Sequence, residues 1–287
     1  MIRTILVAAT GDATDTATFA AALTIARSFG AHLDVLHVRS DPISAGVAMA
    51  AGAGTGALTA GLIEQLEADA QQREARAKDG FTQFCARAGL AVPGAPPAGP
   101  GNAPSAEWHV EIGQEPDWMA VYGRTADLIV ASRSTDEVLA RSMLEAVLLE
   151  SGRPLFIPPP AAMPAAIERI AIAWKPAQQA ARAVAMAMPF LTRAKEILVV
   201  TVEERADERD EADRLLRNLA WHGLAARPER IEPGPDGAAA TLLASVAGRA
   251  DLLVMGGYGH SRVREWVFGG FTQHVLADAS LPVLMAH

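Results

Sequence analysis

Four glycines near the C-terminal end of the chain have the spacing of a phosphate-binding loop. Gly256 and Gly259 follow an apolar run at 251–254, and nine residues separate Gly259 from Gly269 and its neighbour Gly270. Glycine lets backbone N–H groups approach a phosphate closely, and the N-terminus of a following helix adds positive potential. The apolar run reads as a buried strand, and residues 272–277 read as the start of a helix. The sequence therefore predicts a single phosphate cradle between them.

The elements that must position this loop occur twice in the chain. Short apolar strands alternate with amphipathic helices in both halves, which predicts parallel sheets with helices on both faces. A proline-rich stretch at 158–164 reads as a stiff linker, so we place the boundary near residue 163, between a first unit at 1–160 and a second unit at 167–287. The matching strands, in the same order in both halves, are 5–9 with 170–174, 126–130 with 250–254 and 153–157 with 281–285.

Composition excludes several classes of protein. The formal net charge is −8 without a basic cluster, which argues against nucleic acid or an anionic membrane as partner. The single Cys85 excludes an internal disulfide and a Cys-based zinc site. The seven histidines show no metal-ligand spacing, so no metal site is predicted. No secretory signal is visible at the N-terminus, and a cytoplasmic location is expected.

With the repeat in place, the pattern Gly256-x2-Gly259-x9-Gly269 resembles the nucleotide-binding motif of the universal stress protein family in its tandem, two-domain form. The resemblance covers nearly the whole chain. It implies two Rossmann-like α/β units, each with a five-stranded parallel sheet. It also implies that a nucleotide such as ATP, which would bring its own Mg²⁺, sits beyond the carboxyl ends of the first and fourth strands, as the general rule for open α/β sheets also expects.

The residues that the resemblance places at this site only partly follow the family pattern. Gly270 stands where ATP-binding relatives have Ser or Thr, although Thr272 offers a hydroxyl two positions later. Lys175 stands where relatives have an Asp that contacts the nucleoside, and an ammonium group cannot accept those hydrogen bonds. His260 is either a phosphate donor or an ordinary loop residue, and Trp174 either walls the site or packs under the loop. The complete set of expected nucleotide-binding residues is Trp174, Lys175, Val202, Met255, Gly256, Gly259, His260, Gly269, Gly270, Phe271 and Thr272.

The first unit lacks the corresponding loop. No glycine occurs between Val130 and Gly152, and Thr10 occupies the place of the first-strand Asp. We therefore predict that this unit has a degenerate site and serves as a structural partner for the second.

Two functional hypotheses remain open from the sequence. In the first, the second unit binds ATP or a related adenine nucleotide, and the protein acts in stress response by regulating a protein partner that the sequence does not identify. In the second, both units form a nucleotide-free interaction scaffold. No phosphate loop of the G-x-x-x-x-G-K-[ST] type and no nucleophile elbow is present, so we expect no enzyme activity beyond very slow ATP hydrolysis.

The last strand of each unit also predicts how the chain is organised. The segments 155–157 and 283–285 are apolar and would be sheet edges, which invite pairing. In single-domain relatives the corresponding strands pair across a dimer. We predict that they pair antiparallel within this chain as an intramolecular pseudo-dimer, and the sequence leaves a further homodimer open.

Overall fold

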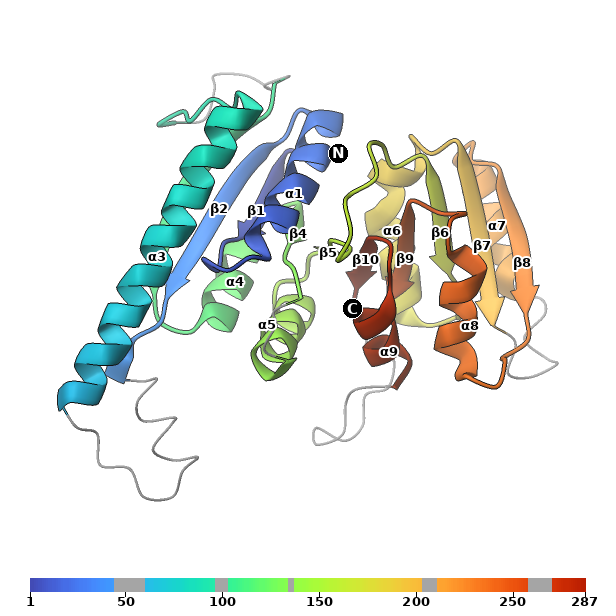
Figure 1. Cartoon of the computed structure of the whole chain (residues 1–287). Helices are drawn as coiled ribbons and strands as arrows, with labels where there is room; N and C mark the ends of the chain where they lie inside the picture. Colours follow the sequence, from blue (N-terminus) through green and yellow to red (C-terminus); the bar gives the residue numbers. More distant parts are fainter. Residues whose placement is uncertain (44–59, 96–102, 134–136, 203–210, 258–269) are drawn as a thin grey trace. The chain divides into compact units, whose positions relative to one another are not determined.

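The computed structural model describes residues 1–43, 60–95, 103–133, 137–202, 211–257 and 270–287. The chain divides into two compact units, Met1–Ser151 and Gly152–His287. Each unit is built on parallel strands with helices packed on both faces of the sheet (Figure 1). The predicted tandem α/β fold is therefore confirmed. The boundary that we placed near residue 163 rests on the linker composition and stays a prediction.

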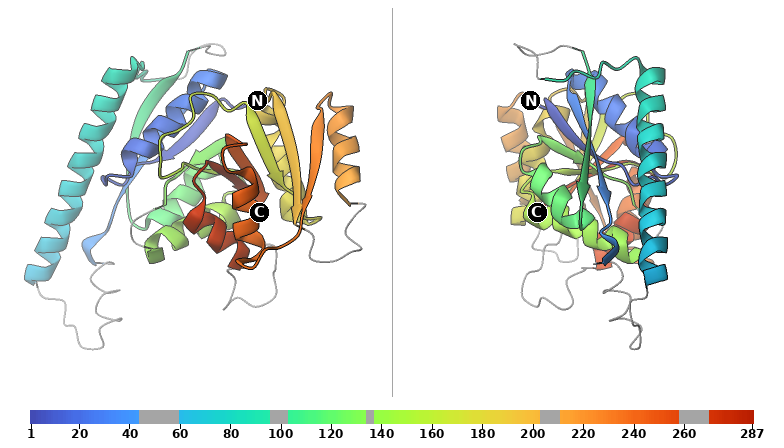
Figure 2. Two further views of the ribbon diagram at one scale, coloured as in Figure 1. Left: turned by 45° about the vertical axis from the view of Figure 1, so that its right-hand side comes forward. Right: turned by 90° about the vertical axis from the view of Figure 1, so that its left-hand side faces the viewer.

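The first unit contains four parallel strands in the spatial order β3-β2-β1-β4. The long helix α3 runs along one face of this sheet, where it also packs on α1 (Figure 2). Helix α4 packs on β1, β2 and α5. The elements are β1 (Thr4–Ala8), α1 (Asp15–Phe29), β2 (His32–Arg39), α3 (Ala60–Ala88), β3 (Ser105–Ile112), α4 (Glu115–Gly123), β4 (Leu128–Val130) and α5 (Glu137–Glu150).

The second unit repeats this plan with five parallel strands in the order β10-β9-β6-β7-β8. Helix α6 packs on β9 and β10, α7 packs on β7 and β8, and α8 packs on α9. The elements are β5 (Leu155–Ile157), β6 (Arg169–Ala173), α6 (Gln178–Leu191), β7 (Glu196–Val202), α7 (Glu211–Trp221), β8 (Ala226–Ile231), α8 (Gly237–Val246), β9 (Leu252–Gly256), α9 (Gly270–Asp278) and β10 (Val283–Ala286).

The predicted pairing of the two short apolar strands is confirmed. β5 runs antiparallel to β10, with Phe156 opposite Leu284 and Ile157 opposite Val283. All three residues of β5 and the first three of β10 are fully buried. The pairing therefore covers two apolar strands that would otherwise be exposed sheet edges.

One aspartate position explains part of the sequence repeat. In the first unit the Asp127 carboxylate accepts hydrogen bonds from the backbone N–H groups of Arg3 (2.7 Å) and Thr4 (3.1 Å). In the second unit Asp251 accepts them from Glu168 (3.1 Å) and Arg169 (2.8 Å). Asp127 precedes β4 and fixes the start of β1 beside it, and Asp251 precedes β9 and fixes the start of β6. The Ala-Asp repeat that opens the matched segments 126–130 and 250–254 therefore has the same structural role in both units.

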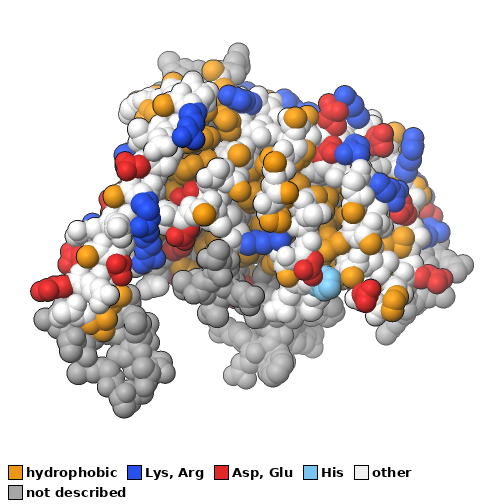
Figure 3. Space-filling view, viewed as in Figure 1, with side chains coloured by type: hydrophobic (Ala, Val, Ile, Leu, Met, Phe, Trp, Pro, Cys, Tyr) orange, Lys and Arg blue, Asp and Glu red, His pale blue; other side chains and the backbone are white. Residues whose placement is uncertain are grey.

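The described surface carries mixed charge. On the face seen in Figure 3, Lys and Arg side chains are interspersed with Asp and Glu. Among the described residues, ion pairs join Arg249 with Glu229 and Lys195 with Glu168 (2.8 Å). Among the described helices, none is both long enough and apolar enough to cross a membrane.

Candidate functional site

The order of the strands in the second unit reverses beside β6. β7 and β8 lie on one side of this strand, and β9 and β10 lie on the other. Ligands of open α/β sheets bind outside the carboxyl ends of the strands at such a reversal. Trp174 and Lys175 follow β6 directly, Val202 ends β7 and Gly256 ends β9. These positions meet at one edge of the sheet because the three strands are parallel.

A cavity of about 370 Å³ lies at this edge. All eight predicted site residues that the structure describes line it, so the structure brings them together around one space. Their contact with a nucleotide stays a prediction. Gly259, His260 and Gly269, the other three, lie outside the described residues. The eight are Trp174, Lys175, Val202, Met255, Gly256, Gly270, Phe271 and Thr272.

Trp174 presents an unsatisfied donor at the cavity. Its backbone N–H donates to the carbonyl of Val200 (2.8 Å), which fixes the residue at the end of β6. Its indole Nε1 is buried and has no hydrogen-bond partner among the described residues. A buried N–H without a partner costs about 1–3 kcal/mol. An acceptor on a bound ligand would remove this cost. Trp174 lines the cavity, and its role toward a nucleotide stays a prediction.

The charged residue among the described lining residues is cationic and suits an anion. Lys175 contributes an exposed ammonium group, and the first residues of α9, Gly270 to Thr272, also line the space. Thr272, one of these residues, is only 6 % exposed. Among the described lining residues there is no carboxylate and no imidazole. The described lining therefore offers attraction for negative charge.

Gly256 has a packing role that the sequence did not indicate. A Cβ at this position would lie 2.6 Å from the backbone nitrogen of Ala180 and 2.7 Å from the carbonyl carbon of Gln179. The first turn of α6 therefore packs directly on the end of β9. The next amide, on Gly257, donates to the carbonyl of Ala286 (2.8 Å) and is engaged in the sheet. Amides that could hold a phosphate must come from later in the loop or from α9.

Sequence reasoning missed the contribution of two helices to the cavity. Ala177, Gln179 and Ala180 approach it from the start of α6, and Ala238 and Leu242 approach it from α8. The α6 residues follow Lys175 closely in sequence, so the position of a helix directly after the first strand was a usable signal. Ala238 and Leu242 carry no motif and could be found only from the fold.

Comparison with known proteins settles the family. The model of the "Universal stress protein family" matches residues 1–91 and 184–287, which together make up more than half of the chain. The chain belongs to the universal stress protein family. No curated protein matches its sequence.

Solved structures agree on the fold over the full length of this universal stress protein. A universal stress protein from Archaeoglobus fulgidus DSM 4304 has a TM-score of 0.70 at 16% identity, covering 99% of this chain and 95% of that one. A functionally unknown protein from Pseudomonas aeruginosa PAO1 has a TM-score of 0.58 at 16% identity, covering 99% and 92%. A putative universal stress protein from Pseudomonas aeruginosa UCBPP-PA14 has a TM-score of 0.54 at 17% identity, covering 99% and 93%. At these identities the likeness concerns the fold alone.

The equivalent strand ends in the first unit of this universal stress protein enclose a much smaller space. The cavity beside β1 and β2 measures about 90 Å³, well below the range of about 300–1,000 Å³ typical of small-molecule sites. The Asp15 carboxylate accepts the backbone N–H groups of Thr10 (2.8 Å) and Gly11 (2.8 Å) and the Thr10 hydroxyl (2.9 Å). The backbone N–H groups of Thr10 and Gly11, at the end of β1, are therefore already hydrogen-bonded within the protein. The absence of a nucleotide site from the first unit stays a prediction.

Glu115, at the start of α4, lines this small cavity and has a shifted pKa. The pKa of Glu115 is raised from the ordinary value of 4.5 to about 7, first by burial and then by the nearby carboxylates of Asp15 and Asp12. Arg73 acts in the opposite direction. The folded protein therefore holds a proton on Glu115 more tightly than the unfolded chain does.

Replacing Glu115 by glutamine should stabilise the protein at alkaline pH. Because the folded-state pKa is raised, the wild-type protein loses stability as the pH rises from about 4.5 to about 7. Glutamine carries no charge to bury, so at pH 8 we expect the free energy of unfolding to rise by about 1–3 kcal/mol. Thermal melts between pH 4 and 8 measure this. Asp117→Asn, an exposed position on the same helix, is the control. Parallel melting curves for wild type and Glu115→Gln across this range would contradict the expectation.

Proposed function

We propose that the second unit binds an adenine nucleotide, ATP or a close relative, and that the protein is a nucleotide-responsive regulatory protein of the stress response. The observation that carries this proposal is the cavity at the reversal of strand order, lined by all eight described residues that the family motif assigns. Its volume of about 370 Å³ lies within the range of small-molecule sites.

The residues that line the cavity fit the base and the phosphates of such a ligand separately. The apolar side chains of Val202 and Leu242 and the ring of Trp174 would receive the base, with the indole N–H available to one acceptor on the ligand. Lys175 and the start of α9 would receive the phosphates, because an ammonium group and a helix N-terminus both favour negative charge. Lys175 stands where relatives have an aspartate. This makes the charge of the site more positive, which favours phosphate recognition.

We infer that the nucleotide acts as a ligand and is not turned over at a useful rate. The described lining holds no general base. A ligand can shift the protein between two states only through a difference in affinity for them, so regulation of a protein partner would require that the nucleotide-bound form presents a different surface. A cytoplasmic protein with access to ATP fits this role.

Filling the cavity tests the proposal. Ala238 lines it from α8, so Ala238→Trp should occupy part of the ligand's volume and weaken binding of Mg-ATP by at least about 30-fold, or 2 kcal/mol. Ala220→Trp on the exposed face of α7 adds the same side chain elsewhere and should leave the affinity within about twofold of wild type. Isothermal titration of the three proteins gives the affinities. We expect about one nucleotide per chain, because the cavity at the equivalent strand ends of the first unit measures only about 90 Å³.

The nucleotide-free scaffold is the second candidate, and specific contacts favour it. Gly256 is explained by its packing on α6, and the Gly257 amide is engaged by Ala286. A motif could therefore persist for structural reasons after loss of the ligand. If wild type gives no binding heat with Mg-ATP at millimolar concentration, the scaffold is the correct interpretation. Equal affinity of wild type and Ala238→Trp would place any binding outside this cavity.

A further inference from the structure

Two neighbouring strands of the first unit carry acidic and histidine side chains on the same face. His32 and Asp34 are two residues apart on β2, and Glu107 and His109 are two residues apart on β3. Alternate residues of a strand point to one side of a sheet. The parallel register places His32 opposite Ser105 and Asp34 opposite Glu107, so an H-x-D pair lies beside an E-x-H pair.

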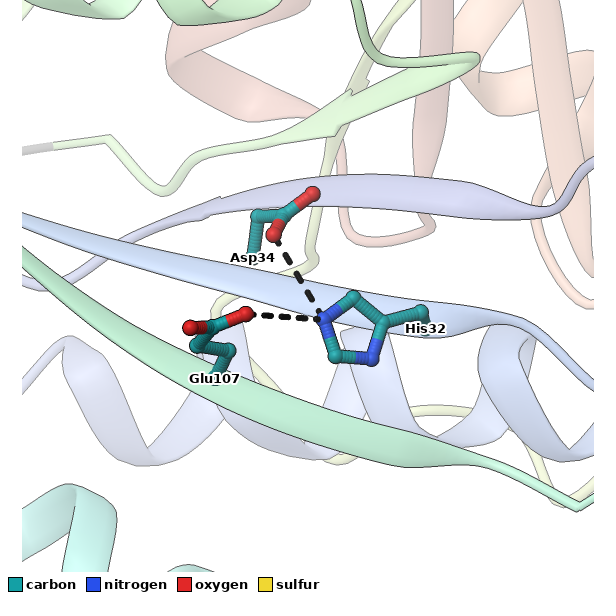
Figure 4. Close-up of side chains that lie close together, drawn as sticks. All are labelled: His32, Asp34 and Glu107. Atoms are coloured by element: carbon teal, nitrogen blue, oxygen red, sulfur yellow. Dashed lines mark ion pairs between the residues drawn. The ribbon is translucent and has the colours of Figure 1, made fainter. Parts of the chain in front are cut away.

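The side chains converge on the His32 imidazole (Figure 4). Its Nε2 lies 3.5 Å from an Asp34 carboxylate oxygen and 4.0 Å from one of Glu107. One coordinating atom from each of these three residues can be chosen so that all lie within 4.8 Å of one another. A tetrahedral zinc ion with bonds of about 2.0–2.2 Å separates its ligand atoms by roughly 3.3–3.6 Å. The observed distances therefore need only small side-chain adjustments to admit an ion.

The supporting contacts have the form of an outer coordination sphere. The other ring nitrogen of His32, Nδ1, lies 2.7 Å from the Ser105 hydroxyl, which holds the ring so that Nε2 faces the carboxylates. His109 Nε2 lies 3.2 Å from the same Asp34 oxygen and orients that carboxylate. Partners of this kind fix the tautomer and direction of metal ligands.

The register of the two strands gives a separate reason for a cation. Asp34 and Glu107 are direct cross-strand neighbours. Like charges at such positions destabilise a sheet. The side chains of His32, Asp34 and Glu107 are partly exposed, between 25% and 41%, so an ion from solvent can reach them.

We propose that His32, Asp34 and Glu107 form a binding site for a zinc-class divalent cation that links the edge strand β3 to β2. One imidazole and two carboxylates suit zinc among the common divalent ions, and three protein ligands leave a fourth position for water. The sequence analysis predicted no metal site. Asp34 and Glu107 lie 73 residues apart in the chain and meet only because β2 pairs with β3.

Metal titration of the untagged, chelator-treated full-length protein tests the site. Wild type should take up about one Zn²⁺ per chain with a rise in melting temperature, and Co²⁺ in its place should give the visible absorption of a low-coordinate site. His32→Gln and Glu107→Gln should each weaken Zn²⁺ affinity by at least about tenfold, and Ser105→Ala by about tenfold through loss of ring orientation.

His274→Gln is the matched control. His274 also lies beside a carboxylate, 3.4 Å from that of Asp278 on the same helix, but has no third ligand in the described structure. Its loss should leave Zn²⁺ affinity unchanged. Circular dichroism of the metal-free variants separates lost binding from lost folding, and Ser105→Ala keeps all three ligands in place if another variant misfolds. Failure of wild type to bind Zn²⁺ at tens of micromolar, or equal affinity of wild type and His32→Gln, would overturn the proposal. Either result would mean that the cluster forms only histidine–carboxylate ion pairs and binds no metal.

Discussion

Replacing Phe156 by alanine should lower the free energy of unfolding by about 3–5 kcal/mol, the cost of emptying a large buried position. Phe156 is the central residue of β5 and is 0 % exposed. It is opposite Leu284 of β10, and its ring lies 6.4 Å from that of Phe190 on α6, with the two planes 24° apart. The substitution would leave a cavity between a strand pair and a helix, and neither side can collapse without breaking the β5–β10 ladder.

Chemical denaturation of the variant measures this loss. Trp221→Ala is the control, since it removes a larger aromatic ring that is 91 % exposed and should change stability by less than about 0.5 kcal/mol. Phe156→Leu should recover part of the loss because it refills most of the volume. If Phe156→Ala and Trp221→Ala were equally stable, β5 would not be part of the folded core.

The architecture could be predicted because each element has a local signal and every element occurs twice. Continuous apolar runs such as Ile170, Ala171 and Ile172 predict strands buried on both faces, as parallel sheets require. The Ala-Asp repeat before the fourth strand predicted a matching position. Its reason, the capping of the neighbouring strand by Asp127 and Asp251, depends on tertiary contact and was not visible.

The candidate site could be predicted only along the strands that carry the motif. Trp174 and Lys175 follow β6 and Val202 ends β7, so the family resemblance and the rule for parallel sheets both place them at one edge. Leu242 and Gln179 come from helices whose rotation about their axes follows from packing and not from a motif. The same limit hid the His32, Asp34 and Glu107 cluster, since register between two parallel strands joined by a long connection has no local sequence signal.

The Gly256 position shows how a motif residue can carry a structural role. In the sequence it belongs to the phosphate-binding pattern, and in the structure it admits the first turn of α6. If its role were confined to the ligand, a substitution would change nucleotide affinity and leave the stability of the ligand-free protein intact. If it is required for packing, stability must fall without any ligand present.

Replacing Gly256 by alanine should lower the free energy of unfolding of the ligand-free protein by about 1–3 kcal/mol, the usual cost of overpacking. The added Cβ would meet the nitrogen of Ala180 at 2.6 Å and the carbonyl carbon of Gln179 at 2.7 Å. Both are backbone atoms, so relief requires a shift of α6 rather than of a side chain. Gly270→Ala is the matched control: its Cβ would meet nothing within 4 Å, and alanine favours a helix by up to about 1 kcal/mol over glycine. Denaturant titrations of both variants without nucleotide decide between the roles, because equal stability of Gly256→Ala and wild type would assign this glycine to the ligand rather than to the contact with α6.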